Sequence, residues 1–284
     1  MKFTKMHGAG NDFLLIESED KRRDWSKLAI AMCERHYGIG ADGLLVILPS
    51  AAHDFQMRVI NSDGSDGGIS GNGLRCAVKY FFDEDKVKQG KKEVTIETIT
   101  GTKTATVTRK AGKVIKVKAG MGTPRFAAKE IPALIGGNHN KIKQMITCPV
   151  TIEGKKLEFN LVSMGNPHAV YFYRGDVDKF PLTSLGPKVE HHKMFPERTN
   201  FEVVRLLGNG RIEARTWERG AGETLACGSG ACAIAVAASL HGYIKDKASI
   251  KEPGGTLEVE WDGAGEVFLS GPTEKVFSGD WPEN

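Results

Sequence analysis

The residues best suited to do chemistry in this sequence are Cys227 and the run Gly228-Ser229-Gly230 that follows it. A largely apolar segment of small residues comes next, which predicts a buried helix beginning directly after the cysteine. The first N–H groups of a helix have no partner inside the helix, and together with the helix dipole they stabilise a negative charge. They can therefore help a thiol to ionise or hold a substrate carboxylate. A buried structural cysteine is the alternative that this segment alone leaves open.

The same pattern occurs a second time, after Ser70. Ser70 and Cys227 are each followed by a Gly-x-Gly sequence and then by an apolar segment with small residues. A second match, of Gly10-Asn11 with Gly165-Asn166, lies in nearly the same register, because the two separations are 157 and 155 residues. We interpret these matches as an internal repeat. It predicts two pseudo-symmetric halves with a ligand cleft between them.

Two helix starts of this kind suit a reaction that inverts a carbon centre. One group removes a proton from one face of the carbon, and a second group returns a proton to the other face. Positioned acid and base groups each contribute about 10²–10⁴-fold in rate. The helix N–H groups would stabilise the charge that develops on a substrate carboxylate.

Strand patterns dominate the rest of the sequence. Alternating, apolar or β-branched runs predict strands over residues 3–7, 12–17, 44–48, 55–61, 93–99, 104–108, 114–118, 201–207, 211–217, 257–261 and 266–270. Glycines separate several of these runs, so hairpins are expected, one of them with Asn209-Gly210 at its tip. Apolar spacing from Trp25 predicts a helix over residues 25–36 that ends just before Gly38. We expect an N-terminal half over residues 1–120, completed by residues 271–284, and a C-terminal half over residues 121–270.

Composition narrows the classes of protein. The 284 residues, 40% hydrophobic and 26% charged, are ordinary for a globular protein. The net charge of +4 comes without a basic cluster interleaved with aromatics, so nucleic-acid binding is not expected. No apolar run suits a membrane span or a signal peptide, and five cysteines without a disulfide pattern favour a cytoplasmic location.

Two kinds of site are not expected from the sequence. The segment Gly38–Gly43 matches G-x-G-x-x-G, but it follows a predicted helix and precedes a predicted strand, which is the reverse of the dinucleotide-binding order. No H-E-x-x-H sequence or paired C-x-x-C sequence is present, so a zinc site is not expected either.

Six segments, spread from residue 3 to about residue 230, resemble the signatures of the diaminopimelate epimerase family in the family's order. They are Phe3–Phe13, Asn61–Ser65, Gly71–Cys76, Met164–His168, Arg198–Asn200 and Trp217–Gly230. The resemblance implies a PLP-independent isomerase without cofactors that converts L,L-diaminopimelate to meso-diaminopimelate for lysine and cell-wall synthesis. It also implies an α/β (α+β) fold of two pseudo-symmetric domains, each a β-sheet wrapped around a central helix, with the active site in the cleft between them.

The resemblance also assigns roles to residues. Cys227 is similar to one of the family's two catalytic thiols, and His168 and Glu218 lie where the family places groups that support the thiols. The implied substrate contacts are the side chains of Asn11, Asn61, Asn72, Asn166 and Asn200, those of Glu218 and Arg219 at the distal amino-acid group, and the backbone of Gly71, Gly228 and Ser229 at the reacting carboxylate. The implied partner is a small amino acid, without nucleic acid, membrane or metal. The sequence does not fix the oligomeric state, and a homodimer stays open.

The sequence departs from the family pattern at two positions. Ser70 stands where the family has its other catalytic cysteine, and a serine hydroxyl hardly ionises without a base of its own. We therefore expect an inactive or impaired form, by engineering or otherwise. Gly43 stands where many members carry a glutamine that touches the substrate, which leaves the exact substrate open.

Two alternatives remain at this point. One is a racemase, isomerase or dehydratase of the same fold that acts on another amino acid, with Ser70 as its natural residue. The other is an amino-acid-binding protein without catalytic activity.

Overall fold

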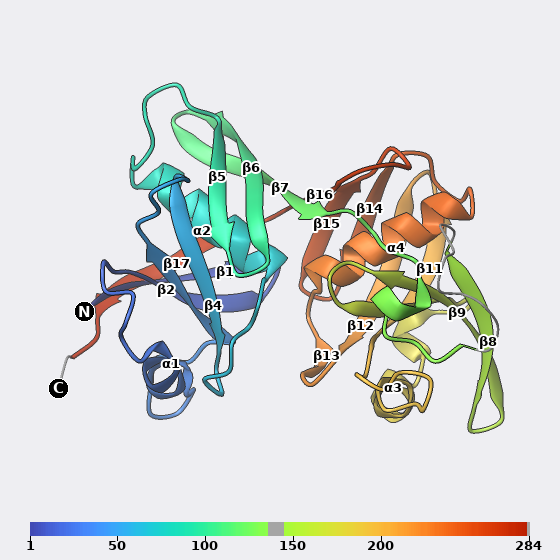
Figure 1. Ribbon diagram of the computed structural model, residues 1–284. Helices are drawn as coiled ribbons and strands as arrows, with labels where there is room; N and C mark the ends of the chain where they lie inside the picture. Colours follow the sequence, from blue (N-terminus) through green and yellow to red (C-terminus); the bar gives the residue numbers. More distant parts are fainter. Residues whose placement is uncertain (136–144, 283–284) are drawn as a thin grey trace. The chain divides into compact units, whose positions relative to one another are not determined.

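The computed structural model describes residues 1–135 and 145–282 and contains both helices and strands (Figure 1), so the mixed α and β class is confirmed. Its contacts fall into two compact units. Unit 1 comprises Met1–Gly120 together with the residues from Ser270 on, and unit 2 comprises Met121–Leu269. Among the helices of the described residues, none is long and apolar enough to cross a membrane.

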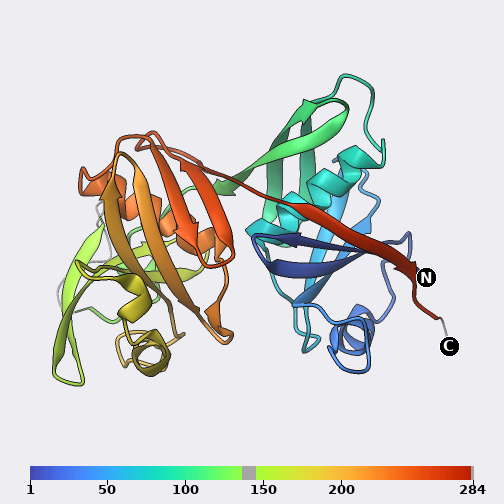
Figure 2. The same ribbon diagram turned by 180° about the vertical axis from the view of Figure 1, so that it is seen from behind.

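The strands of unit 1 pair into one sheet. In spatial order they are β17 (Glu274–Asp280), β1 (Lys2–Gly8), β2 (Asn11–Glu17), β3 (Gly43–Leu48), β4 (Phe55–Asn61), β5 (Glu93–Thr98), β6 (Gly101–Lys110) and β7 (Lys113–Gly122). The pairs β2–β3 and β4–β5 are parallel, and the other pairs are antiparallel. Figure 2 shows β17, from the end of the chain, beside β1. Both ends of the sequence therefore build this unit.

The central strands of unit 1 are covered on both faces. Leu14 of β2 packs with helix α1 (Trp25–Cys33), whereas the next residue, Leu15, packs in the cluster of helix α2 (Gly71–Asp83). Successive side chains of a strand point to opposite faces. A helix on each face therefore explains why these strands are continuous apolar runs.

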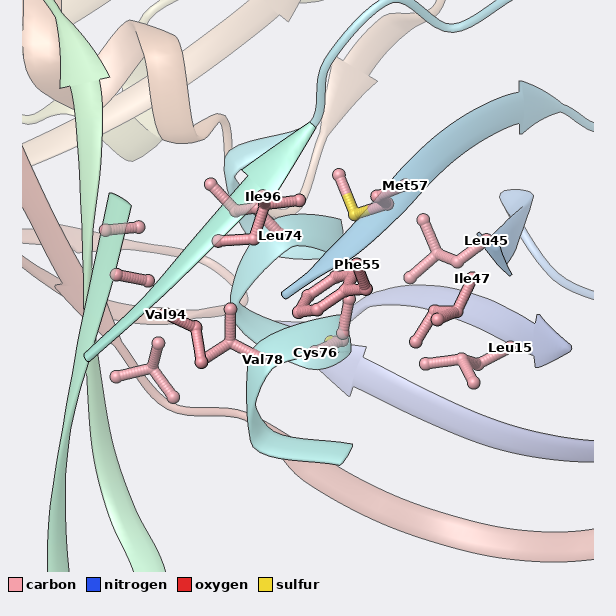
Figure 3. Close-up of a cluster of buried hydrophobic side chains, with 14 of the residues drawn as sticks. Leu15, Leu45, Ile47, Phe55, Met57, Leu74, Cys76, Val78, Val94 and Ile96 are labelled. Atoms are coloured by element: carbon pink, nitrogen blue, oxygen red, sulfur yellow. The ribbon is translucent and has the colours of Figure 1, made fainter. Parts of the chain in front are cut away.

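Helix α2 lies within the core of unit 1. Figure 3 shows Leu74, Cys76 and Val78 of this helix among the side chains of the surrounding strands, with Phe55 and Ile96 nearby. Every strand from β1 to β7 contributes to the same cluster. Burying each large apolar side chain stabilises the fold by roughly 1.5–3 kcal/mol. The packing therefore fixes the position at which α2 begins.

The described residues of unit 2 form a second set of strands, two α-helices and two short 3-10 helices. The paired strands are β8 (Ile146–Ile152), β9 (Lys155–Ser163), β10 (Pro167–Phe172), β11 (Asn200–Gly208), β12 (Arg211–Glu218), β14 (Lys247–Glu252) and β15 (Gly255–Glu260); β13 (Gly222–Thr224) pairs with β12, and β16 (Val267–Gly271) follows. Helix α3 (Leu182–Glu190) packs on one face, and α4 (Gly228–Leu240) is almost wholly buried against β9, β10, β11, β14 and β15. Small residues along α4 allow this close approach.

The two units repeat the same topology. In unit 1, each strand from β1 to β6 pairs with the next, and the five pairs are antiparallel, parallel, antiparallel, parallel and antiparallel. In unit 2, the successive pairs formed by β9, β10, β11, β12, β14 and β15 follow the same order. Matching elements of the two units begin 157 residues apart: α3 after α1, β11 after β3, and α4 after α2. The internal repeat predicted from the sequence is confirmed.

All eleven predicted strands and both glycine-led helices are present, although several of their ends differ by a few residues. The hairpin between β11 and β12 turns at Asn209 and Gly210, whose φ values of 54° and 72° are those of a type I′ turn. The predicted helix over residues 25–36 is too long, because α1 ends at Cys33. There the Glu34 carboxylate accepts the backbone N–H of His36 at 2.6 Å and competes with further helical bonds.

Candidate active site

Cys227 occupies the N-cap of α4. Its backbone is extended (φ −114°, ψ 111°), and its Sγ accepts a hydrogen bond from the Gly230 N–H at 3.3 Å. The hydroxyl of Ser229 lies 3.6 Å from the same sulfur atom, and Cys227 is buried. Such a cap satisfies one of the N–H groups that the first turn leaves without a partner. The predicted start of a helix directly after Cys227, at Gly228, is therefore confirmed.

Ser70 forms the equivalent cap at the start of α2. Its backbone has nearly the same conformation (φ −119°, ψ 121°), and its Oγ accepts the Gly73 N–H at 3.0 Å. No ionisable side chain within residues 1–135 and 145–282 hydrogen-bonds with this hydroxyl. Gly71 begins α2 as Gly228 begins α4. The two caps thus share one backbone geometry.

A pair of polar side chains accompanies each cap. In unit 1, Asn72 Nδ2 donates to Asn11 Oδ1 at 3.3 Å, and in unit 2, Asn166 Nδ2 donates to Ser229 Oγ at 3.2 Å. These residues match one another in the register of the repeat. In unit 1 the buried guanidinium of Arg75 also donates to Asn72 Oδ1 at 2.7 Å. Each pair includes the second residue of its helix, so these side chains lie beside the caps.

The cap of unit 2 is connected to a buried histidine and carboxyl pair. His168 Nδ1 lies 2.6 Å from Glu202 Oε1, with both side chains fully buried, and His168 Nε2 lies 2.9 Å from Asn166 Oδ1. With the Asn166 nitrogen facing Ser229, the amide oxygen faces His168 and only accepts, so Nε2 carries a proton. His168 is therefore linked through Asn166 and Ser229 to the sulfur of Cys227.

Two further carboxyl groups reach Cys227. Glu218, at the end of β12, hydrogen-bonds with the Cys227 side chain and accepts the Thr224 hydroxyl at 2.6 Å. Glu252, at the end of β14, accepts the Cys227 backbone N–H at 3.2 Å and the Thr216 hydroxyl at 3.0 Å. Burial raises the pKa of both carboxyl groups, that of Glu252 to about 8.

The thiol of Cys227 is held in its protonated form. Burial raises its pKa well above the ordinary value, and the charges of Glu218, Glu252 and Glu202 raise it further, whereas the hydrogen bond with Ser229 lowers it. The expectation that the helix start makes this thiol ionise more readily is therefore wrong for this structure. A helix terminus supplies at most about 2 kcal/mol, which burial and three carboxyl groups exceed.

The cap of unit 1 lacks the matching histidine and carboxyl groups. In the register of the repeat, the positions of His168, Glu202, Glu218 and Glu252 are taken in unit 1 by Phe13, Leu45, Asn61 and Thr98. Apolar or neutral side chains thus replace the histidine and all three carboxyl groups. The two caps share a backbone but differ in charge.

Asn61 and Gly43 lie opposite each other on β4 and β3. Asn61 is exposed, and its Nδ2 donates to Ser65 Oγ at 2.9 Å. A Cβ atom at Gly43 would lie 2.8 Å from the backbone oxygen of Ile60. A side chain at position 43, such as glutamine, therefore requires a shift of the backbone.

Asn200 and Arg219 are joined to each other in unit 2. The buried Asn200 amide donates to Pro167 O at 2.9 Å and accepts the Arg219 backbone N–H at 2.8 Å. The exposed Arg219 guanidinium donates to the backbone oxygen of Glu197 at 3.1 Å. Asn200 thus sets the chain direction directly after Glu218.

Sequence reasoning missed Glu202 and Glu252. Glu202 stands between apolar residues of β11, and Glu252 follows the exposed Lys251 at the end of β14, so neither drew attention as a site residue. The alignment of the two halves could have indicated both residues, because it matches Glu202 with the apolar Leu45 and Glu252 with the neutral Thr98. In the described part of the chain, no group of three His, Cys, Asp or Glu side chains could hold a metal ion.

Comparison with known proteins identifies the family. The model of the diaminopimelate epimerase family matches residues 3–127 and 160–276. A protein of Acetivibrio thermocellus named diaminopimelate epimerase is 44% identical over 283 residues, which cover 99% of this chain and 98% of that protein. A Methanococcus maripaludis protein of the same name is 44% identical over 282 residues and 99% of each chain.

Solved structures share the fold at low sequence identity. A probable proline racemase from Agrobacterium radiobacter, with bound carbonate, has a TM-score of 0.72 at 15% identity and covers 100% of this chain and 93% of that one. A hydroxyproline epimerase from Agrobacterium vitis, with bound trans-4-hydroxy-L-proline, has a TM-score of 0.68 at 14% identity and covers 98% and 91%. The full-length sequence matches, together with this fold and the paired helix caps, show that the chain belongs to the diaminopimelate epimerase family.

Proposed function

We propose that this protein is a diaminopimelate epimerase, which converts L,L-diaminopimelate to meso-diaminopimelate by two-base proton transfer at the α-carbon. The product serves the synthesis of lysine and of cell-wall precursors. One observation carries the proposal: the same helix cap is built twice, with Cys227 in one unit and Ser70 in the other, in a chain of this family.

Cys227 is the proton donor in this mechanism. Its raised pKa leaves the thiol protonated before reaction, so it can return a proton to the carbanion. Glu218 accepts a hydrogen bond from this side chain, and His168 reaches it through Asn166 and Ser229. Glu218 can therefore restore the proton after each turnover, whereas His168 orients Asn166 and Ser229 beside the thiol.

The residue at position 70 has the opposite task, which is to remove the α-proton from the other face. A thiolate is suited to this step. The cap of unit 1 would favour one, because the helix start stabilises the anion and the positions that match the three carboxyl groups of unit 2 hold none. A hydroxyl without a base does not ionise there. The Ser70 form is therefore impaired, by about 10²–10⁴-fold for the loss of one acid/base group.

The substrate is held by its carboxylate and its distal end. We assign the reacting carboxylate to the backbone N–H groups of Gly71, Gly228 and Ser229, because N–H groups at a helix start bind anions. Asn11, Asn61, Asn72, Asn166 and Asn200 contact the amino acid, and Glu218 and Arg219 bind its distal amino-acid group. The reaction uses no cofactor, since both proton transfers are made by side chains.

The test uses the chain as it is and its Ser70→Cys variant. Each is incubated with L,L-diaminopimelate in heavy water, and both deuterium at the α-carbon and meso product are measured. We expect the Ser70→Cys variant to exchange and to epimerise, about 10²-fold or more faster than the parent chain.

The double variant Ser70→Cys/Cys227→Ser is the matched control, because it has the same number of thiols as the parent. It should lose the gained activity again. A Ser70→Cys variant that folds but neither exchanges deuterium nor forms meso product would show that the proposed reaction is incorrect.

A further inference from the structure

The carboxyl group of Glu252 holds the main chain of Cys227. Glu252 is 3% exposed, and both of its oxygens lie within hydrogen-bond distance of the Cys227 N–H, at 3.3 and 3.2 Å. The hydroxyl of Thr216 donates to Glu252 Oε1 at 3.0 Å. This carboxyl group therefore joins β14, β12 and the residue that caps α4.

The fold does not need a carboxyl group at this position. In unit 1 the equivalent of Glu252 is Thr98, and the equivalent of Thr216 is Val59. The cap of unit 1 nevertheless adopts the same backbone conformation. Because a buried carboxyl group is costly to accommodate, a role at the thiol explains Glu252 better than construction of the turn does.

Acidic groups surround Glu252. Glu218 on β12 and Glu202 on β11 act on it through their charges, and His168 on β10 pairs with Glu202. Helix α4 carries no charged residue, and on β15 Gly255 stands opposite Glu252. Burial and these charges raise the pKa of Glu252 to about 8. Its neutral and ionised forms therefore interchange close to the pH at which a thiol ordinarily ionises.

We propose that Glu252 is a positioning residue for the thiol: in its neutral form it fixes the Cys227 main chain and permits a thiolate, and as a carboxylate it keeps Cys227 protonated. The inference rests on the proposed function only for the part that Cys227 plays in proton transfer. In the neutral form one oxygen accepts the Cys227 N–H, and the O–H is donated to the Thr216 hydroxyl, which can also accept. Ionisation places a negative charge beside the sulfur and disfavours a second one.

The test measures the ionisation of Cys227 in Glu252→Gln. Glutamine keeps an oxygen for the Cys227 N–H but carries no charge. The ultraviolet absorbance of thiolate is followed across pH, and each spectrum is corrected with the same variant carrying Cys227→Ser. The subtraction removes the other four cysteines: Cys232, and Cys33, Cys76 and Cys148, whose pKa values burial raises to about 12, 12 and 11. We expect the midpoint to fall by about one pH unit or more.

Two further variants separate charge at this position from general effects. Glu258→Gln, on the neighbouring strand β15, removes a carboxyl group that is only partly buried and should leave the midpoint unchanged. Thr216→Val removes a hydrogen bond that stabilises the Glu252 carboxylate, so it should lower the midpoint in the parent chain but not in Glu252→Gln.

An unchanged midpoint in Glu252→Gln, or an equal shift in Glu258→Gln, would overturn the inference. The titration needs no substrate. A Ser70→Cys variant without epimerase activity would therefore contradict the proposed function while leaving the result for Glu252 in place.

Discussion

His168 and Glu202 meet at positions where unit 1 has Phe13 and Leu45, both apolar and buried. The attraction within a buried ion pair is largely offset by the loss of hydration. The same backbone is stable in unit 1 with apolar side chains. We therefore expect the pair to be retained because it orients Asn166 and Ser229 beside Cys227, rather than for stability.

This comparison predicts the effect of separating the pair. His168→Phe alone leaves Glu202 buried without its partner and should lower the free energy of unfolding by about 3–5 kcal/mol. His168→Phe combined with Glu202→Leu restores the apolar pair found in unit 1, so most of that loss should be recovered. Urea unfolding of the parent, both single variants and the double variant measures the four free energies. A double variant that is as unstable as His168→Phe alone would show that the pair is needed for stability.

At this scale the sequence identified the capping positions Ser70 and Cys227, because helix starts after glycine-rich turns are local features. The family resemblance supplied His168 and Glu218. The direction of the Cys227 pKa was beyond the sequence, because it depends on burial and on carboxyl groups from three strands that are distant along the chain. Only the folded sheet brings Glu202 and Glu252 to the same sulfur atom.

Among the elements, helix α3 had no counterpart in the sequence-based prediction. It contains Gly186 and Pro187, two residues that usually indicate a turn or the end of a helix. The structure explains the glycine, because a Cβ atom there would lie 2.4 Å from the ring of Trp217 on β12. The helix is therefore stabilised by tertiary packing, which local propensity does not contain. Strands and hairpins with clear alternation, such as β4, were predicted with their correct ends.

Gly186→Ala tests this account of α3. The added methyl group overlaps the Trp217 ring, so the free energy of unfolding should fall by about 1–3 kcal/mol even though alanine favours helices. Ser184→Ala, at an exposed position of the same helix, should be neutral or slightly stabilising. Thermal unfolding of both variants measures the difference. A Gly186→Ala variant as stable as Ser184→Ala would mean that the helix and the Trp217 ring can separate at little cost.

At the scale of the whole molecule, the repeat explains how one protein obtains two similar caps with different chemistry. The two halves keep the strand order and the 157-residue register of their helices, while the residues around each cap have diverged in charge. The sequence revealed the repeat through two short matches. The expectation that residues 271–284 complete the N-terminal half did not include the pairing of β17 with β1, because that pairing joins residues about 270 positions apart.

The return of β17 predicts unequal effects of a truncation after Gly271. Strand β17 pairs with β1 from Lys2 to His7. The rings of Phe277 and Phe3 pack edge to face, with their centroids 5.9 Å apart. The Met1 amino group donates to the Trp281 backbone oxygen at 2.7 Å. Loss of these contacts exposes the edge of β1, so hydrogen exchange should accelerate in the peptides of unit 1 and stay unchanged in those of unit 2. Lys275→Ala, which removes only a surface ion pair with Glu84, serves as the control and should leave both units protected. Equal acceleration in both units would instead mean that they unfold as a single cooperative structure.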